Sequence, residues 1–186
     1  MSESDAAVND TAVVRRCQTG DPEAFAVLVE RHRTMLFGTA YLMTRDRQMA
    51  EDAVQEALIQ IWKNIGSLRK PDGLKAWLAR IVVNEVRQQA RKRHAPLVTL
   101  EAIPDPPEEN TGAGSSELRQ DLAGAVAMLP PDQREAVVLR FFSDLTVAEI
   151  AAATGSREGT VKSRLSRAMD RLGEMLRGYG NGEGRK

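Results

Sequence analysis

The sequence predicts an all-α protein in which two small helical domains are joined by a flexible linker. Apolar residues recur every three or four positions through most of the 186 residues, and no alternating run bounded by turn residues indicates a strand. One proline- and acid-rich stretch, Ala95 to Glu117, breaks this pattern and is long for a loop inside one domain. We expect domains at 1–95 and 117–178, a flexible acidic linker at 96–116 and a disordered tail at 179–186.

Three helices are expected in the first domain. Asp21 and Pro22 are typical of a helix start, with a capping carboxylate before a proline at the first helical position. Asp46 opens the next helix, and the third extends from about Leu74 to Arg93. The first nine or so residues are expected to be disordered, as chain ends often are.

Four shorter helices are expected in the second domain, at about 117–128, 132–142, 146–153 and 157–177. The third begins with a T-x-x-E capping box formed by Thr146 and Glu149. Gly155 lies where the chain must turn sharply, and Ser156 is positioned to cap the last helix. Such a helix-turn-helix places its second helix in the major groove of DNA.

The last helix has an apolar back and a basic front. Val161, Leu165, Met169 and Leu172 form the expected core-facing side. Arginine and lysine neutralise phosphates, and arginine also pairs with guanine edges, so the front predicts duplex DNA binding. The expected DNA contacts are Arg157, Thr160, Lys162, Ser163, Arg164, Arg167 and Arg171. This motif alone indicates only DNA binding, because many regulators contain it.

Charge is sorted along the chain although the net charge is zero. Residues 61–95 hold nine basic and two acidic side chains, whereas residues 96–130 hold one basic and six acidic. Segments in which one sign of charge predominates indicate separate surfaces, and the basic segments suit binding to nucleic acid. The third helix of the first domain carries a basic, amide-bearing face that suits a DNA backbone and unpaired bases. Its members are Arg80, Asn84, Arg87, Gln88 and Arg91.

A different face is expected on the helix that follows Asp46. Ile59 stands there among the polar side chains of Asp52, Gln55 and Glu56. An apolar residue amid carboxylates and amides predicts a protein interface.

Other classes of protein fit the sequence poorly. A single cysteine, Cys17, excludes an internal disulfide and fits a reducing cytoplasm. Neither a signal peptide nor a membrane span is expected, because no long apolar run occurs. Adjacent acids such as Glu51 and Asp52 do not face each other on a helix, and His32 and His94 lack metal-ligand neighbours. We therefore expect no catalytic site, no metal and no cofactor.

Five segments in this order resemble the bacterial RNA polymerase sigma factors of the extracytoplasmic-function (ECF) group. They are GDPEAFAVLVERHR, AEDAVQEALIQIWKN, LKAWLARIVVNEVR, LPPDQREAVVLRFFSDLTVAEIAAATG and GTVKSRLSRAMDRL. The order resembles family region 2, a linker without region 3, and then region 4.

The resemblance implies that the chain binds core RNA polymerase and directs promoter-specific transcription initiation. Asp52, Gln55 and Glu56 match the family face that binds the β′ clamp helices, and the second domain would meet the β flap. The helix from Leu74 to Arg93 matches the one that melts and reads the −10 element. The helix from Arg157 matches the reader of the −35 element. ECF factors are often held by an anti-sigma protein, which joins promoter DNA and polymerase among the candidate partners.

Within the −10 reader, Asn84 and Trp77 match family residues, and the loop Ser67 to Gly73, which contains Lys70, matches the one that accepts a flipped base. Three positions depart from the family pattern. Gln88 stands where an Asp is frequent, Leu74 stands where a Phe is frequent, and the loop SLRKPDG has no aromatic residue. These differences leave open the −10 sequence and the stacking partner of a flipped base. Two alternatives also stay open: a stand-alone helix-turn-helix regulator and a protein-interaction adaptor.

Overall fold

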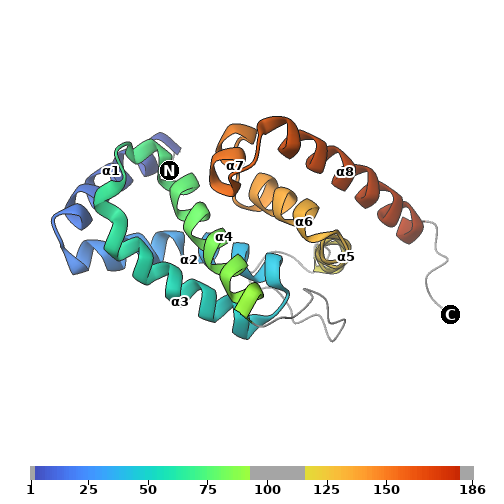
Figure 1. Ribbon diagram of the computed structural model, residues 1–186, viewed down its shortest axis with the longest axis horizontal. Coiled ribbons are helices and arrows are strands. Elements are labelled where there is room, and N and C mark those ends of the chain that lie inside the picture. Colours follow the sequence, from blue (N-terminus) through green and yellow to red (C-terminus); the bar gives the residue numbers. More distant parts are fainter. Residues whose placement is uncertain (1–2, 93–115, 181–186) are drawn as a thin grey trace.

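The computed structural model describes residues 3–92 and 116–180, with side chains for 10–92 and 122–177, and all its regular elements are helices (Figure 1). The linker expected at 96–116 lies outside the described residues except for Ser116, the first residue of a helix. Of the tail expected at 179–186, residues 179 and 180 are the last two of α8, and residues 181–186 lie outside the described residues.

The first domain contains α1 (Glu3–Gln18), α2 (Pro22–Thr44), α3 (Arg47–Asn64) and α4 (Leu74–Lys92). The expected helix starts are confirmed. The Asp21 carboxylate accepts hydrogen bonds from the backbone N–H groups of Glu23 and Ala24, and Asp46 accepts one from Met49. Two short 3-10 turns, η1 (Ile65–Ser67) and η2 (Pro71–Gly73), connect α3 to α4.

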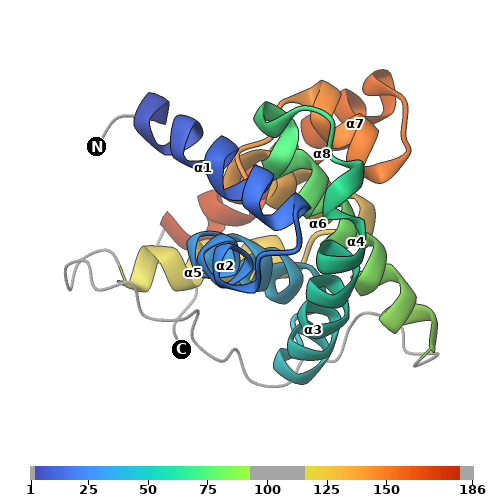
Figure 2. The same ribbon diagram turned by 90° about the vertical axis from the view of Figure 1, so that its left-hand side faces the viewer.

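Helix α1 corrects the expectation that the first nine residues are disordered. It begins at Glu3 and packs on α2, with Val13, Val14 and Cys17 buried in the core. Figure 2 views α2 almost along its axis, with α1 and α3 on different sides of it. The fully buried alanines Ala53 and Ala57 lie on α3, which packs against both α2 and α4. Small side chains at such positions allow helices to approach closely.

The second domain contains α5 (Ser116–Ala127), α6 (Pro131–Val137), α7 (Val147–Thr154) and α8 (Glu158–Gly180). Helix α6 continues into a π-helical turn, η3 (Val138–Phe142). The capping box at the start of α7 is confirmed, since the Thr146 hydroxyl and the Glu149 carboxylate each accept the other's backbone N–H. Gly155 ends α7 at a φ of 67°, a left-handed conformation that glycine adopts without strain. The expected helix-turn-helix is therefore formed by α7 and α8.

The buried face of α8 differs from the expected one by a single position. Val161, Ala168 and Leu172 are buried and Leu165 is partly buried, whereas Met169 is 49% exposed. The buried positions are spaced by four, three and four residues, which keeps them on one stripe of the helix. Met169 follows Ala168 and is rotated away from that stripe, so its expected place in the core was wrong.

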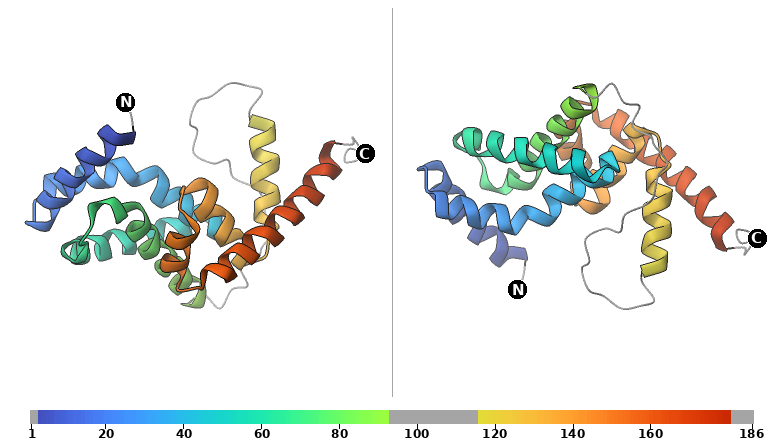
Figure 3. Two further views of the ribbon diagram at one scale, coloured as in Figure 1. Left: turned by 90° about the horizontal axis from the view of Figure 1, so that it is seen from above. Right: turned by 90° about the horizontal axis from the view of Figure 1, so that it is seen from below.

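The two domains pack against each other and share one continuous apolar core. Helix α7 lies against α4, while η3, α5 and α6 contact α2. Figure 3 shows α5 and α8 extending away from the first domain. This packing places the candidate −10 reader beside the helix-turn-helix domain.

Candidate nucleic-acid and polymerase interfaces

Helix α4 presents a polar face to solvent and an apolar face to the core. Leu74, Leu78, Val82 and Val86 are buried. The exposed members of the predicted DNA-binding face are Arg80, Asn84, Gln88 and Arg91. Arg91 and Lys92 add positive charge to the last turn, where it also complements the helix dipole. The structure thus brings four of the five side chains of the predicted polar face of α4 to one accessible surface.

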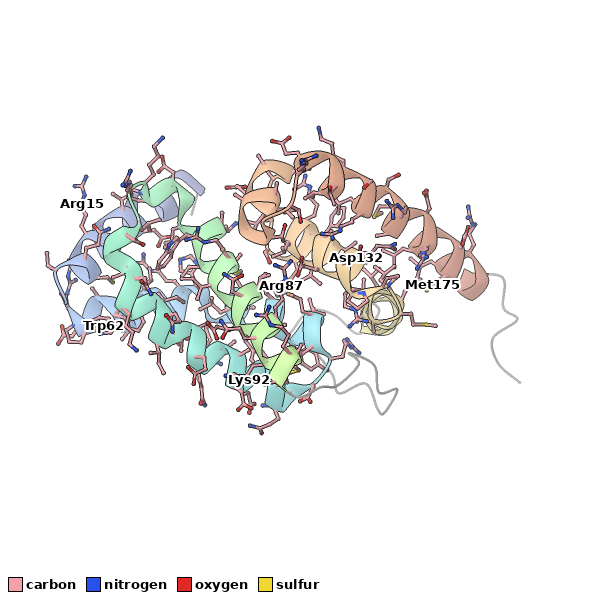
Figure 4. All side chains as sticks on the ribbon, in the orientation of Figure 1. Arg15, Trp62, Arg87, Lys92, Asp132 and Met175 are labelled. Atoms are coloured by element: carbon pink, nitrogen blue, oxygen red, sulfur yellow. The ribbon has the colours of Figure 1, made fainter. Side chains whose placement is uncertain are left out.

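Arg87, the fifth of these side chains, is engaged with the second domain. Its Nε and Nη2 atoms donate to the two carboxylate oxygens of Glu135 at 3.0 and 2.7 Å. A third N–H group donates to the carbonyl oxygen of Thr154 at 3.2 Å. Figure 4 places Arg87 on α4 on the side that faces α6. Bidentate arginine–carboxylate pairs are among the stronger hydrogen-bonded contacts in proteins, so Glu135 holds this side chain in place, although the side chain stays 37% exposed.

Trp77 does not lie where the predicted DNA contact requires it. The ring is only 9% exposed and belongs to the core between the helices, so no base can stack on it in this arrangement. The hydrophobic effect favours this placement, because burying a large ring removes much apolar surface from water. Trp62 is the more accessible tryptophan, at 39% exposure, and it packs edge-on against Phe25.

The loop before α4 is held by a residue that sequence reasoning missed. The Gln18 side-chain amide, at the end of α1, donates to the carbonyl oxygens of Ile65 and Leu68 at 3.2 and 2.9 Å. Lys70 follows this anchored segment and is exposed between η1 and η2. Gln18 and its two acceptors are about fifty residues apart along the chain, so no local pattern could have revealed the contact.

One carboxyl group, that of Glu85, is buried beneath the exposed polar face of α4. Burial, and secondarily the neighbouring charge of Glu56, raise the pKa of Glu85. The Gln88 amide donates to this carboxyl group at 3.4 Å. Glu85 thus lies beneath the polar surface and faces the helix that carries the predicted polymerase contacts.

The basic face of α8 is largely exposed to solvent. Its exposed members are Thr160, Lys162, Arg167 and Arg171, and Arg157, directly before the helix, is exposed as well. Arg164 is less free, since its Nε lies 3.2 Å from Asp132 on α6 and Nη1 donates to the Ser156 hydroxyl. Ser156, which was expected to cap α8, is thus an acceptor for Arg164. The Ser163 hydroxyl donates to the Thr160 carbonyl, so it is already used within the helix.

The predicted polymerase face of α3 is accessible. Gln55, Glu56 and Ile59 are exposed, with Ile59 at 46%, and Asp52 is half-buried and accepts a hydrogen bond from Gln48 at 3.0 Å. Carboxylates and an amide therefore surround one apolar side chain on a rigid helix. A partner with basic groups around an apolar patch would complement this surface.

Comparison with known families assigns the two domains. The family model described as Sigma-70 region 2 matches residues 28–95, and the model described as Sigma-70, region 4 matches residues 119–172. The ECF RNA polymerase sigma factor SigM of Mycobacterium tuberculosis is 34% identical over 93% of this chain and 87% of its own length. The chain belongs to the ECF sigma factors.

Other sigma factors are also similar to this chain over most of its length. The ECF RNA polymerase sigma-E factor of Escherichia coli is 33% identical over 89% of this chain and 93% of its own length. The sigma factor RpoE of Bartonella quintana, solved with the anti-sigma factor NepR, superposes with a TM-score of 0.69 at 34% identity, covering 82% of this chain and 96% of that one. CnrH, solved with the cytosolic domain of CnrY, gives 0.66 at 25% identity, covering 91% and 97%.

The chain is therefore a sigma factor that directs core RNA polymerase to promoters, and its partners are that enzyme and promoter DNA. Sigma factors are transcription initiation factors and not catalytic enzymes. Within the described part of the chain, no helix combines the length and apolar character needed to cross a membrane.

Proposed function

We propose that this ECF sigma factor reads two promoter elements with two separate helices. The exposed face of α4 and Lys70 hold the melted −10 strand, and the front of α8 enters the major groove at the −35 element. The observation that carries this proposal is the presence in one chain of two exposed basic helical faces, one of which lies on the second helix of a capped helix-turn-helix. Amide and guanidinium groups suit unpaired bases, and the basic front of a helix-turn-helix suits duplex DNA.

For Arg87 to join the −10 contacts it must leave Glu135, and Trp77 would require a rearrangement of the core to reach a base. We therefore assign the −10 strand first to Arg80, Asn84, Gln88 and Arg91. We assign the duplex contacts to five exposed residues on or directly before α8, namely Arg157, Thr160, Lys162, Arg167 and Arg171. Ser163 and Arg164 would contribute once DNA replaces their present partners within the protein.

Docking on polymerase is assigned to α3. Asp52, Gln55, Glu56 and Ile59 would contact the β′ clamp helices, and the second domain would meet the β flap. We divide the chain into a docking and −10 domain at 1–95, a linker at 96–116, a −35 domain at 117–178 and a tail at 179–186. Two DNA contacts on one polymerase act multivalently, so neither must bind tightly alone. The protein would act in the cytoplasm, where core polymerase and promoter DNA meet.

An anti-sigma protein is a further candidate partner. Two similar solved structures are complexes, one of RpoE with the anti-sigma factor NepR and the other of CnrH with the cytosolic domain of CnrY. Such a protein would need to cover the α3 docking face, the α4 face or both to silence this chain.

Transcription with purified components tests the proposed function. Core polymerase, with and without this chain, is supplied with a library of genomic fragments, and the RNA 5′ ends are sequenced. We expect new start sites that depend on the chain and share two upstream elements. DNA binding by the chain without any new start site would contradict the proposal and favour a stand-alone regulator. The shared upstream elements would also give the −10 and −35 sequences directly.

A further inference from the structure

Two exposed cations lie in the connection between α3 and α4, directly before the polar face of α4. They are Arg69 and Lys70, which stand between η1 and η2, and α4 begins at Leu74. Contacts to phosphate carry no sequence information directly, but they fix the register in which a nucleic acid meets the protein. The place at which the backbone holds these cations therefore determines which bases of a bound strand meet the α4 face.

The Gln18 amide fixes the backbone that leads into this loop. Its Nε2 atom donates to the carbonyl oxygens of Ile65 and Leu68 at 3.2 and 2.9 Å. An amide nitrogen carries two hydrogens, so the two acceptors use both of them. The side chains of Ile65 and Leu68 are buried in the core. The segment before Arg69 is thus held on two sides, by its side chains in the core and by its carbonyl groups on Gln18.

Gln18 has a rigid support of its own. It is the last residue of α1, and the preceding Cys17 is 2% exposed and belongs to the core. Arg16 forms an ion pair with Asp21 at 2.7 Å, and the same carboxylate caps α2. Helix α1 also contacts both η1 and η2 (Figure 1). The amide is therefore placed by the joined ends of two helices, which suits a group that must hold a loop at one position.

We propose that Gln18 is a positioning residue for −10 recognition, because it holds the loop of Arg69 and Lys70 where that loop sets the register of the melted strand on α4. This inference rests on the proposed roles of α4 and Lys70, and it adds α1 to the −10 reader. Gln18 acts through the loop and needs no contact with DNA. Its loss should change which −10 sequences are preferred. A merely structural role would instead lower transcription from every promoter alike.

Hydrogen exchange on the free chain tests the anchor itself. Gln18→Met keeps the length of the side chain and removes the donor. The backbone N–H groups of Leu68 and Gly73 donate within the two turns, so exchange in peptides that cover 66–73 reports their opening. We expect exchange to become faster by roughly two- to tenfold, the factor that the net contribution of one hydrogen bond gives. Equal exchange would show that the buried side chains hold the segment without Gln18, and would overturn the proposal.

Thr19→Val is the matched control for this exchange experiment. The Thr19 hydroxyl also donates to a backbone carbonyl, but its acceptor is Arg16, within α1. Valine keeps the shape of threonine and removes the donor. We expect both the exchange of 66–73 and the −10 preferences of this variant to equal those of the unmodified chain. Changes as large as those of Gln18→Met would mean that any loss at the end of α1 disturbs the loop, which would contradict a specific role for Gln18.

Promoter selectivity is measured with the holoenzyme on a library that keeps the −35 element and randomises the −10 element, with a transcribed barcode for each promoter. The positions at which Lys70→Met alters the base preference identify where the loop acts. We expect Gln18→Met to lower the preference at the same positions by roughly two- to tenfold and to leave the others unchanged. An unaltered preference profile, with or without a uniform fall in RNA output, would overturn the positioning role.

Failure of this inference differs from failure of the proposed function. If Lys70→Met or Asn84→Ala alters the −10 profile and Gln18→Met does not, the proposed function stands and the positioning role falls. If none of the three alters the profile, the −10 assignment falls as well. The double variant Gln18→Met and Lys70→Met adds a further test, since residues that act through one loop have effects that are less than additive. Fully additive effects would place Gln18 outside the action of Lys70 and overturn the inference.

Discussion

The guanidinium of Arg134 on α6 donates to the carbonyl oxygen of Met43, in the last turn of α2, at 3.1 Å. The same guanidinium donates to the carbonyl oxygen of Ala127, the last residue of α5, at 2.5 Å and to that of Leu129, in the following turn, at 3.1 Å. Carbonyl groups in the last turn of a helix lack partners within that helix. One buried cation, 2% exposed, thus satisfies the ends of two helices that belong to different domains.

Replacing this cation should destabilise the protein. Arg134→Met keeps most of the side-chain length but leaves buried carbonyl groups without donors, at about 1–3 kcal/mol for each group that water cannot reach. Urea unfolding followed by circular dichroism measures the loss. Arg33→Met, on the exposed side of α2, is the matched control and should change the unfolding midpoint little. Equal midpoints for the two variants would show that Arg134 does not support the helix ends.

Reversing a charge on the proposed docking face of α3 should weaken binding to core polymerase. Asp52→Arg places a cation where the proposed partner surface is basic, so the variant should no longer co-purify with core polymerase. Glu30→Arg makes the same change on an exposed position of α2, outside the proposed face, and should co-purify normally. Circular dichroism of both variants checks that the helices are retained. Undiminished co-purification of a folded Asp52→Arg chain would remove Asp52 from the interface.

On α8, Arg167 gives a cleaner test of −35 binding than Arg164. Arg167 is exposed, whereas Arg164 also pairs with Asp132, so its loss would disturb the packing of α6 on α8. Arg167→Ala should weaken promoter binding of the holoenzyme by about 1–3 kcal/mol if the side chain makes a bidentate base contact. Arg177→Ala, near the end of α8, is the control. If both variants bind equally, Arg167 faces solvent in the complex and its predicted role is wrong.

Much of the fold followed from local signals in the sequence. The caps at Asp21 and Asp46 and the capping box at Thr146 determine where helices begin, because they act within one turn of the chain. Helix α1 was missed because it lies at the chain end and because Val13, Val14 and Cys17, which are buried, lie in its second half. Met169 was misplaced because it and Ala168 are both apolar neighbours, and only packing decides which one faces the core.

The packing of the domains could not be predicted from the sequence. Arg134 and Glu135 are adjacent charged residues, which usually indicates a solvated surface. They are buried because α2 and α4, far away in the chain, supply a carbonyl group and a guanidinium. The predicted faces of α3 and α8 are accessible in the structure, whereas Trp77 is buried and the guanidinium of Arg87 is bound to Glu135. Contacts with distant parts of the chain determine where such side chains lie.

Substituting Gly38 on α2 should weaken the contact between the two domains. A Cβ atom at this position would lie within 2.5 Å of atoms of the Phe142 ring, so Gly38→Ala must displace that ring. Alanine also favours the helical conformation by roughly 1 kcal/mol over glycine. We expect the first domain to remain folded, while a carbodiimide crosslink between the Lys75 amine and the Asp144 carboxylate, which are 3.4 Å apart, forms in lower yield. Gly66→Ala, at a position with open space around it, is the control; equal linking in both variants would mean that the ring adjusts without moving the domain.

The raised pKa of Glu85 predicts how the free energy of unfolding depends on pH. Burial and the charge of Glu56 raise the pKa of Glu85 above its usual value of 4.5, so the folded protein holds this proton more tightly than the unfolded chain does. Its contribution to stability is therefore complete below that usual value and is lost as pH rises through the raised pKa. Glu85→Gln keeps an uncharged group at every pH and should be more stable than the unmodified chain at pH 7. The difference between the two should shrink in acid, and urea unfolding at both pH values measures it. A Glu85→Gln chain that is less stable at pH 7 would show that the carboxylate gains more from Gln88 and Lys92 than burial costs it.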